Sequence, residues 1–157
     1  MSNNRRVGRE YALKTLFALH LSDNQGSSGA LLETFLADFR FADDALGEPL
    51  PTENAPLSTS TRLFAESIVN GVVEHCSVID RKIAAVAKNW SLERMTPVDL
   101  SILRIGVYEI LYRPEIPHPV VIDEAIEIAK RYGTKDSPAF INGLLDKISK
   151  TPAVSAD

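Results

Sequence analysis

The stretch from Thr96 to Arg113 has apolar residues on nearly all sides and predicts a buried helix. Thr96 can cap its start, and Pro97 suits the first helical position. Pro114 disfavours helical geometry at the residue before it, so the helix should end at Arg113. The apolar positions of this stretch are Leu100, Ile102, Leu103, Ile105, Val107, Ile110 and Leu111. A helix that is apolar all round must be surrounded by other helices.

Three polar groups, Arg104, Tyr108 and Glu109, lie inside this apolar run. Ionised side chains are tolerated in a core only when they are paired. We therefore expect an internal ion pair that fixes one packing arrangement, because buried charges are more often structural than catalytic.

Helical periodicity predicts four further helices on the N-terminal side of this stretch. The first runs from Asn4 to about Ser22, with an inner face of Leu13, Leu16, Phe17, His20 and Leu21. The second covers about residues 31–39. A longer apolar period from Ser60 to Val86 should break near Cys76–Ser77, because Ser77-Val-Ile-Asp80 resembles a capping box. This break gives two helices.

Two more helices should follow the central one. Pro119 starts a helix over Val120–Tyr132 that Gly133 closes, and Ser137 caps the last helix. The expected inward residues are Ile122, Ala125, Ile126 and Ala129 in the former and Ile141, Leu144, Leu145 and Ile148 in the latter. Residues 43–57 read as an exposed proline-rich loop and residues 151–157 as a loose tail. The sum is an all-α fold of about seven helices within one domain, residues 1–157.

Composition is that of an ordinary globular protein of 157 residues, with 45% hydrophobic and 24% charged residues. Such a chain can bury enough surface to fold unaided, as one domain or as two small lobes that share a core. The single Cys76 excludes an internal disulfide and fits a reducing compartment. No apolar run would span a bilayer, and the N-terminus lacks a signal-peptide core. We expect a cytoplasmic protein without membrane partners.

The net charge of −4 conceals a basic N-terminus. Residues 1–20 carry Arg5, Arg6, Arg9 and Lys14 against Glu10 alone. Arginines at a helix N-terminus oppose the helix dipole, so their placement is poor for stability and favours a functional purpose. The pattern predicts a phosphate-binding arm, the alternative being a solvated, frayed end.

Signals for catalysis or metal binding are weak. The eight glycines form no phosphate-cradling loop, and no nucleophile elbow occurs. Glu115 and His118 have the spacing of a bundle metal site, but the prolines around them forbid the helix that this site needs. We predict a binding protein that has no catalytic residues, metal or cofactor.

A second cluster with binding chemistry lies at the start of the last helix. Phe140 falls at the edge of the apolar stripe, and Lys135 and Asp136 lie just before it, after Lys130 and Arg131. An edge aromatic can stack on a base, cations can neutralise the backbone, and a carboxylate can accept a hydrogen bond from a base. From the residues alone, inward packing of Phe140 with Asp136 as a turn residue is equally acceptable.

Four blocks of the chain closely resemble the bacterial transcription antitermination factor NusB family: RRVGREYALKTLFAL, LSILRIGVYEIL, IPHPVVIDEAIEIAKRYG and DSPAFINGLLDKI. The similarity covers most of the chain in order, apart from residues 43–57. It implies an all-α fold of two packed helical subdomains. It also implies a transcription regulator that binds single-stranded boxA RNA of ribosomal RNA leaders with the small-subunit ribosomal protein NusE. This assembly, with other Nus factors, would help elongating RNA polymerase to resist termination.

The resemblance also implies two sets of site residues. The RNA-binding set, to which Lys135 is added as a neighbouring cation, is Arg5, Arg6, Arg9, Phe17, Lys135, Asp136 and Phe140. The set that contacts the ribosomal protein is Glu93, Asp99 and His118, with Arg104 in support. We expect the RNA to lie along a groove between the first and last helices.

Three residues depart from the family pattern. Val7 stands where a third consecutive arginine is common, and Gly8 weakens a helix by roughly 1 kcal/mol relative to alanine. Both suggest weaker RNA affinity for the lone protein and more dependence on the partner. His118 stands where a phenol is expected.

Two alternatives come from other classes of function. A protein–protein adaptor would join the ribosomal protein without touching RNA. An RNA-modifying enzyme is the other, because NusB-like domains also precede ribosomal RNA methyltransferase domains, but no chain remains here for a cofactor-binding domain.

Overall fold

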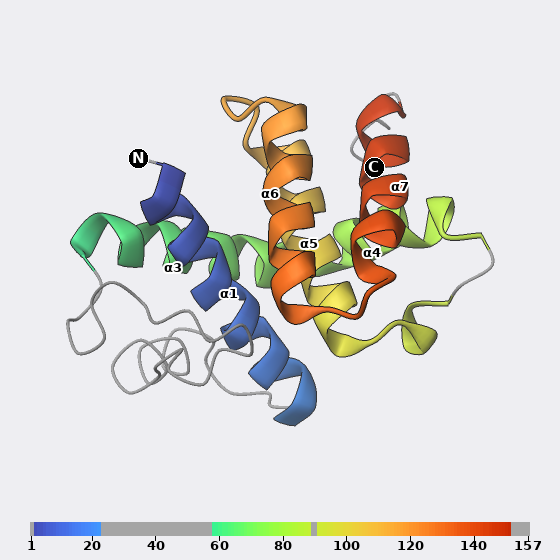
Figure 1. Ribbon diagram of the computed structural model, residues 1–157, viewed down its shortest axis with the longest axis horizontal. Helices are drawn as coiled ribbons and strands as arrows, with labels where there is room; N and C mark the ends of the chain where they lie inside the picture. Colours follow the sequence, from blue (N-terminus) through green and yellow to red (C-terminus); the bar gives the residue numbers. More distant parts are fainter. Residues whose placement is uncertain (1, 23–57, 89–90, 152–157) are drawn as a thin grey trace. The chain divides into compact units, whose positions relative to one another are not determined.

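The protein is all-helical in the part of the chain that the computed structural model describes, residues 2–22, 58–88 and 91–151 (Figure 1). The elements are α1 (Ser2–Ser22), α3 (Thr59–Glu74), α4 (Cys76–Val86), the 3₁₀ helix η1 (Leu92–Arg94), α5 (Pro97–Tyr112), α6 (His118–Tyr132) and α7 (Ser137–Lys150). These ranges contain no strand, which confirms the predicted fold class. The helix expected over 31–39, the loop over 43–57 and most of the tail lie outside them. None of the described helices has the length and apolar character needed to cross a membrane.

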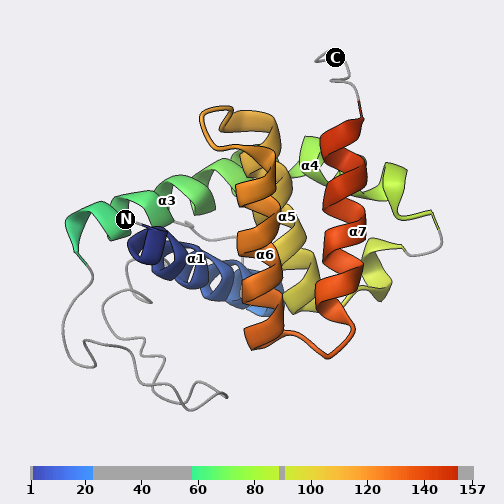
Figure 2. The ribbon, with the colours of Figure 1, turned by 45° about the horizontal axis from the view of Figure 1, so that its top comes forward.

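The chain divides into two compact units, Met1–Glu74 and His75–Asp157, here called the N-terminal and C-terminal units. In the N-terminal unit α1 packs against α3, as Figures 1 and 2 both show. The predicted α1 face is correct at Leu13 and Leu16, which are buried, whereas Phe17 is only half-buried. The buried apolar residues of α1 and α3 include Tyr11, Ala12, Leu13, Leu16, Ala65, Ile68, Val69 and Val72.

Gly8 allows α1 to approach α3 closely. A Cβ atom at this position would lie 2.9 Å from Cδ2 of Phe64 and 3.3 Å from the carbonyl oxygen of Thr61. Both distances are shorter than ordinary van der Waals contact. The sequence presents Gly8 as a residue that weakens the helix, and the structure adds a packing reason for it.

In the C-terminal unit α5 is the central helix, because α4, α6 and α7 all contact it. Most of its 16 residues are buried. The hydroxyl of Thr96 accepts a hydrogen bond from the amide of Asp99 at 3.1 Å, and Pro97 takes the first helical position. The prediction of a capped, buried helix at this position is confirmed.

The predicted break in the long apolar run is confirmed, but its proposed cause is wrong. The break lies at His75, so Ser77 falls inside α4 rather than capping it. Asp80 does not complete a capping box, because both of its carboxylate oxygens accept hydrogen bonds from Arg104 of α5. This pairing across two helices provides the expected internal ion pair.

Helix α6 differs from its prediction in its start and its buried face. It begins at His118 rather than Val120, and Ile122 and Ile126 are only half-buried. Its buried residues are Val121, Ala125, Ile128 and Ala129.

The connection from α6 to α7 depends on the small size of Gly133. Its φ of −94° and ψ of −166° are extended rather than left-handed. However, a Cβ atom there would lie 2.5 Å from the Ser137 hydroxyl oxygen. Ser137 is the buried first residue of α7, not its cap, and its hydroxyl accepts a hydrogen bond from the amide of Thr134 at 2.9 Å. The four apolar residues predicted to be buried in α7 are buried.

Candidate nucleic-acid interface

The arginine arm, Arg5, Arg6 and Arg9, lies in the N-terminal half of α1. Arg5 is exposed and Arg6 is half-buried, whereas Arg9 is only 3% exposed. The guanidinium carbon lies 4.9 Å from the centroid of the Phe64 ring for Arg5 and 5.2 Å for Arg9. Both distances are within the range of a cation–π interaction. Two of the three arginines of the arm therefore lie over an aromatic ring of α3.

Sequence reasoning missed this role of Phe64. The residue fits the helical period of α3, so its spacing predicts a core position. In the structure it is only half-buried. An aromatic residue at the edge of an apolar stripe was the available signal, but spacing alone does not show which cations face it.

Phe17 lies on the same face of α1 as Arg6. The two residues are eleven positions apart, which is about three helical turns and about 16 Å along the axis. Both side chains are half-buried.

The second group of predicted RNA-binding residues surrounds the start of α7. Lys135 and Asp136 are exposed, and Phe140 is half-buried at the edge of the helix. Asp136 occupies the N-cap position, but its carboxylate makes no capping hydrogen bond. The exposed carboxylate is therefore placed to accept a hydrogen bond from outside the protein.

The turn before α7 is held by its own hydrogen bonds. The amide of Asp136 donates to the hydroxyl of Thr134 at 3.3 Å, and the amide of Ser137 donates to the carbonyl of Thr134 at 3.1 Å. Pro138 has no amide hydrogen. The first two residues of α7 therefore offer no free N–H group to a phosphate.

The two groups of predicted RNA-binding residues belong to different units. Arg5, Arg6, Arg9 and Phe17 belong to the N-terminal unit. Lys135, Asp136 and Phe140 belong to the C-terminal unit.

The residues expected to contact the ribosomal protein all belong to the C-terminal unit. Glu93 lies in η1, Asp99 in the first turn of α5, and half-buried His118 at the start of α6. Asp99 is 8% exposed, and its Oδ1 finds no hydrogen-bond donor among the residues that the structure describes. Because that oxygen is itself buried, only the rest of the carboxylate could contact a partner in this conformation.

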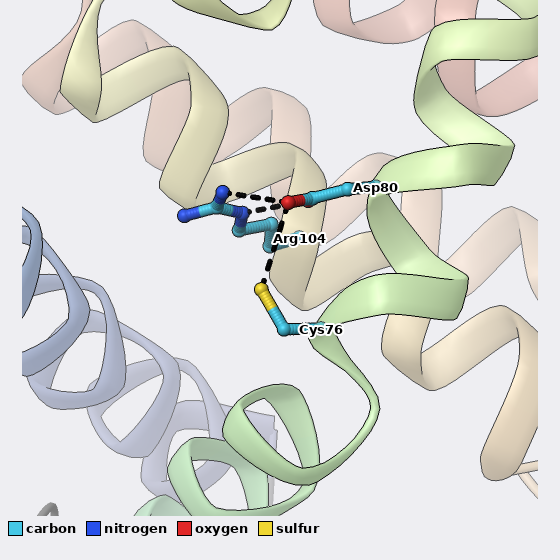
Figure 3. Close-up of polar contacts among 3 residues, drawn as sticks. All are labelled: Cys76, Asp80 and Arg104. Carbon is cyan, nitrogen blue, oxygen red and sulfur yellow. Dashed lines mark hydrogen bonds and ion pairs between the residues drawn. The ribbon is translucent and has the colours of Figure 1, made fainter.

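Arg104 is engaged within the protein (Figure 3). Its Nε and one terminal nitrogen each donate to Asp80 at 2.9 Å, and the Cys76 thiol lies 3.6 Å from the same carboxylate. Burial alone would lower the pKa of Arg104, but the hydrogen bonds and charge of Asp80 outweigh it and raise that pKa. Burial raises the pKa of the Cys76 thiol, the charge of Arg104 opposes this, and Asp80 adds to the increase. The cluster joins α4 to α5.

The C-terminal unit also contains an aromatic cluster that sequence reasoning did not predict, formed by His75, Tyr108 and Tyr112. The rings of His75 and Tyr112 stack with centroids 4.0 Å apart, and Tyr108 stacks on Tyr112 at 5.7 Å.

Arg113 forms an ion pair with Glu115 at 2.7 Å, and the hydrogen bond to Glu115 raises the pKa of Arg113 despite partial burial. Over the described residues, no group of three or more His, Cys, Asp or Glu side chains could hold a metal ion.

Comparison with known proteins gives a consistent result. The sequence profile of the NusB family matches residues 6–150. The chain is 50% identical over 150 residues to the transcription antitermination protein NusB of Syntrophotalea carbinolica, covering 96% of this chain and 94% of that protein. It is 46% identical over 147 residues to the protein of the same name from Geobacter sulfurreducens, covering 94% of each.

Solved structures of NusB proteins share the fold of this chain. The T. maritima NusB structure is 36% identical with a TM-score of 0.76, and the match covers 93% of this chain and 90% of that one. A crystal structure of antitermination factors NusB and NusE in complex with dsRNA contains a chain with a TM-score of 0.75, over 96% of this chain and 98% of that one. At 23% identity, that second similarity establishes the fold alone. From the profile match and these relatives, the chain belongs to the NusB family.

Proposed function

We propose that this protein is a transcription antitermination factor that binds boxA-type RNA of ribosomal RNA leaders together with the ribosomal protein NusE. The family match over residues 6–150 is the observation that carries the proposal. The names of the relatives and the NusB–NusE–dsRNA assembly of a protein with the same fold support it. The complex would act on elongating RNA polymerase with other Nus factors, in the cytoplasm and without catalysis of its own.

The arginine arm supplies the sequence-independent part of RNA affinity in this proposal. Arg5 and Arg6 contact phosphates, because their side chains keep access to solvent. Arg9 is almost fully buried, so it contributes through its charge rather than through direct contact. Phe17 extends the contact surface along the face that Arg6 occupies.

The residues at the start of α7 supply base recognition. The Phe140 ring stacks on an unpaired base, the Asp136 carboxylate accepts a hydrogen bond from a base edge, and Lys135 neutralises phosphate. Phosphate contacts fix position, whereas base contacts carry sequence information. Changes in this group should therefore alter the preference for boxA, whereas changes in the arm should weaken all sequences alike.

The contacts with NusE are proposed for Glu93, Asp99 and His118 in the C-terminal unit. Acidic residues that face a basic ribosomal protein would raise the rate of association and favour the correct partner. Arg104 acts indirectly in this proposal, since its fork is engaged by Asp80. It holds α4 against α5.

A salt-titrated RNA binding experiment tests the proposal, using boxA and scrambled RNA with and without NusE. Losing the Phe140 ring in Phe140→Leu should cost about 1–3 kcal/mol of binding energy for boxA. Arg6→Ala should weaken both RNAs and reduce the slope of log affinity against log salt by about one phosphate contact. Arg81→Ala removes the same charge from an exposed position on α4 and serves as the control.

Unchanged affinity for both Arg6→Ala and Phe140→Leu would refute the RNA-binding assignment. If the same variants still formed a complex with NusE, the result would favour the adaptor function, in which NusE alone contacts the RNA.

A further inference from the structure

We propose that Phe64 of α3 is a positioning residue that holds Arg5 ready for RNA before the RNA binds. This inference rests on the proposed function, because it concerns the same arginine arm. It adds a residue of α3 to the arginine arm of α1.

The geometry around the Phe64 ring supports this role. Two guanidinium groups, those of Arg5 and Arg9, lie within 5.2 Å of one ring centroid. An aromatic face attracts cations, and arginine is the side chain most often found there. One half-buried ring therefore interacts with two of the three arginines of the arm.

Without this ring the arginine arm would carry an electrostatic cost. Arg5 and Arg9 are four residues apart on one helix, where like charges destabilise each other. Both also lie in the N-terminal half of α1, where the helix dipole disfavours cations. The negative face of Phe64 opposes both effects. It allows a concentration of positive charge that the helix alone would not favour.

Gly8 allows the ring to approach α1 closely. Gly8 precedes Arg9 and lies three residues after Arg5, and a Cβ atom there would meet Phe64 Cδ2 at 2.9 Å. The absence of a side chain at Gly8 therefore leaves room for the ring against the helix. A larger residue would force the ring or the helix to shift.

The consequence for binding follows from the exposure of the two arginines. Arg9 is 3% exposed, whereas Arg5 is exposed and keeps donors available to a ligand. Arginine has many rotamers, and fixing it before binding reduces the entropy lost in the complex. For one long side chain this saving corresponds to about a two- to tenfold gain in affinity.

A double-mutant cycle on the full-length protein tests the inference through boxA RNA affinity. The variants are Arg5→Ala, Phe64→Leu and the double variant, with thermal unfolding measured for each. We expect Phe64→Leu to weaken binding about two- to tenfold. We also expect the double variant to bind no more weakly than Arg5→Ala alone, because Phe64 acts through Arg5.

Two ring variants separate positioning from packing. Phe64→Tyr keeps the negative ring face and should retain boxA affinity. Incorporating pentafluorophenylalanine at position 64 keeps the shape but reverses the ring quadrupole, so it should weaken binding even though the protein remains folded. This variant also provides the test if Phe64→Leu fails to fold.

The outcomes distinguish this inference from the proposed function. If Arg5→Ala weakens binding but the fluorinated ring does not, the positioning role of Phe64 is overturned and the arm's role in RNA binding stands. Additive losses in the cycle would overturn it in the same way. If Arg5→Ala itself leaves the affinity unchanged, the positioning role of Phe64 is overturned, and Arg6→Ala decides whether the arm's role in RNA binding stands.

Discussion

Two glycines inside helices should respond to alanine with opposite signs. Gly8 is the seventh residue of α1, and Gly143 is the seventh residue of α7. Alanine favours a helix interior by about 1 kcal/mol relative to glycine, so propensity alone predicts the same gain at both positions. The difference between them must come from what surrounds the new methyl group.

The surroundings give the magnitudes. Gly143 is exposed, and no heavy atom lies within 4 Å of the added Cβ, so Gly143→Ala should stabilise the protein by about 1 kcal/mol. At Gly8 the Cβ would meet the Phe64 ring at 2.9 Å and the Thr61 carbonyl oxygen at 3.3 Å. Overpacking of this kind costs about 1–3 kcal/mol, which offsets the gain and leaves a net loss of up to about 2 kcal/mol.

Thermal unfolding followed by circular dichroism measures both effects, and each variant is the control for the other. For a protein of this size, 1 kcal/mol shifts Tm by about 2–4 °C. Gly143→Ala should therefore raise Tm by that amount, whereas Gly8→Ala should leave it unchanged or lower it. If Gly8→Ala raised Tm as much as Gly143→Ala, the close packing of α1 on α3 would be incorrect.

Two further predictions concern the cluster that joins α4 to α5. Asp80→Ala leaves the largely buried Arg104 without its bidentate partner and should cost about 1–3 kcal/mol in urea unfolding, whereas a loss below about 0.5 kcal/mol would argue against the pair. The alkylation rate of Cys76 should rise with a midpoint at higher pH than that of a free cysteine thiol measured alongside, because burial raises the pKa of the Cys76 thiol. Asp80→Asn should lower that midpoint, since the charge and hydrogen bond of Asp80 both raise the pKa of Cys76. A midpoint at or below that of the free thiol in the unaltered protein would contradict this assignment.

The sequence was most informative about features that depend on residues close together in the chain. The capping of α5 by Thr96 and Pro97 depends on neighbouring residues, and the buried face of α7 follows from its period. For α6 the period was ambiguous, because apolar residues cover a wide arc from Val120 to Ala129. Which of them are buried depends on the position of α5 and α7, and this is tertiary information.

The family resemblance named the residues of the candidate site, but it did not show their surroundings. The spacing of Ser77 and Asp80 fits a capping box, yet Asp80 pairs with Arg104, 24 residues later in the chain. Likewise, Phe64 has the spacing of a core residue, yet two arginines from α1 lie over its ring. Both interactions join residues that are far apart in the sequence, so no local pattern can identify them.

The proposed function requires that boxA RNA contact both the arginine arm of α1 and the start of α7. Photocrosslinking of a single boxA RNA to the protein, followed by mass-spectrometric mapping of the adducts, measures whether it does. Adducts are expected on the peptides that contain Arg5 and Arg6 and on those that contain Phe140, with scrambled RNA crosslinking mainly to the former. Adducts confined to one of the two groups, or absent from both while NusE is crosslinked, would contradict the proposed function.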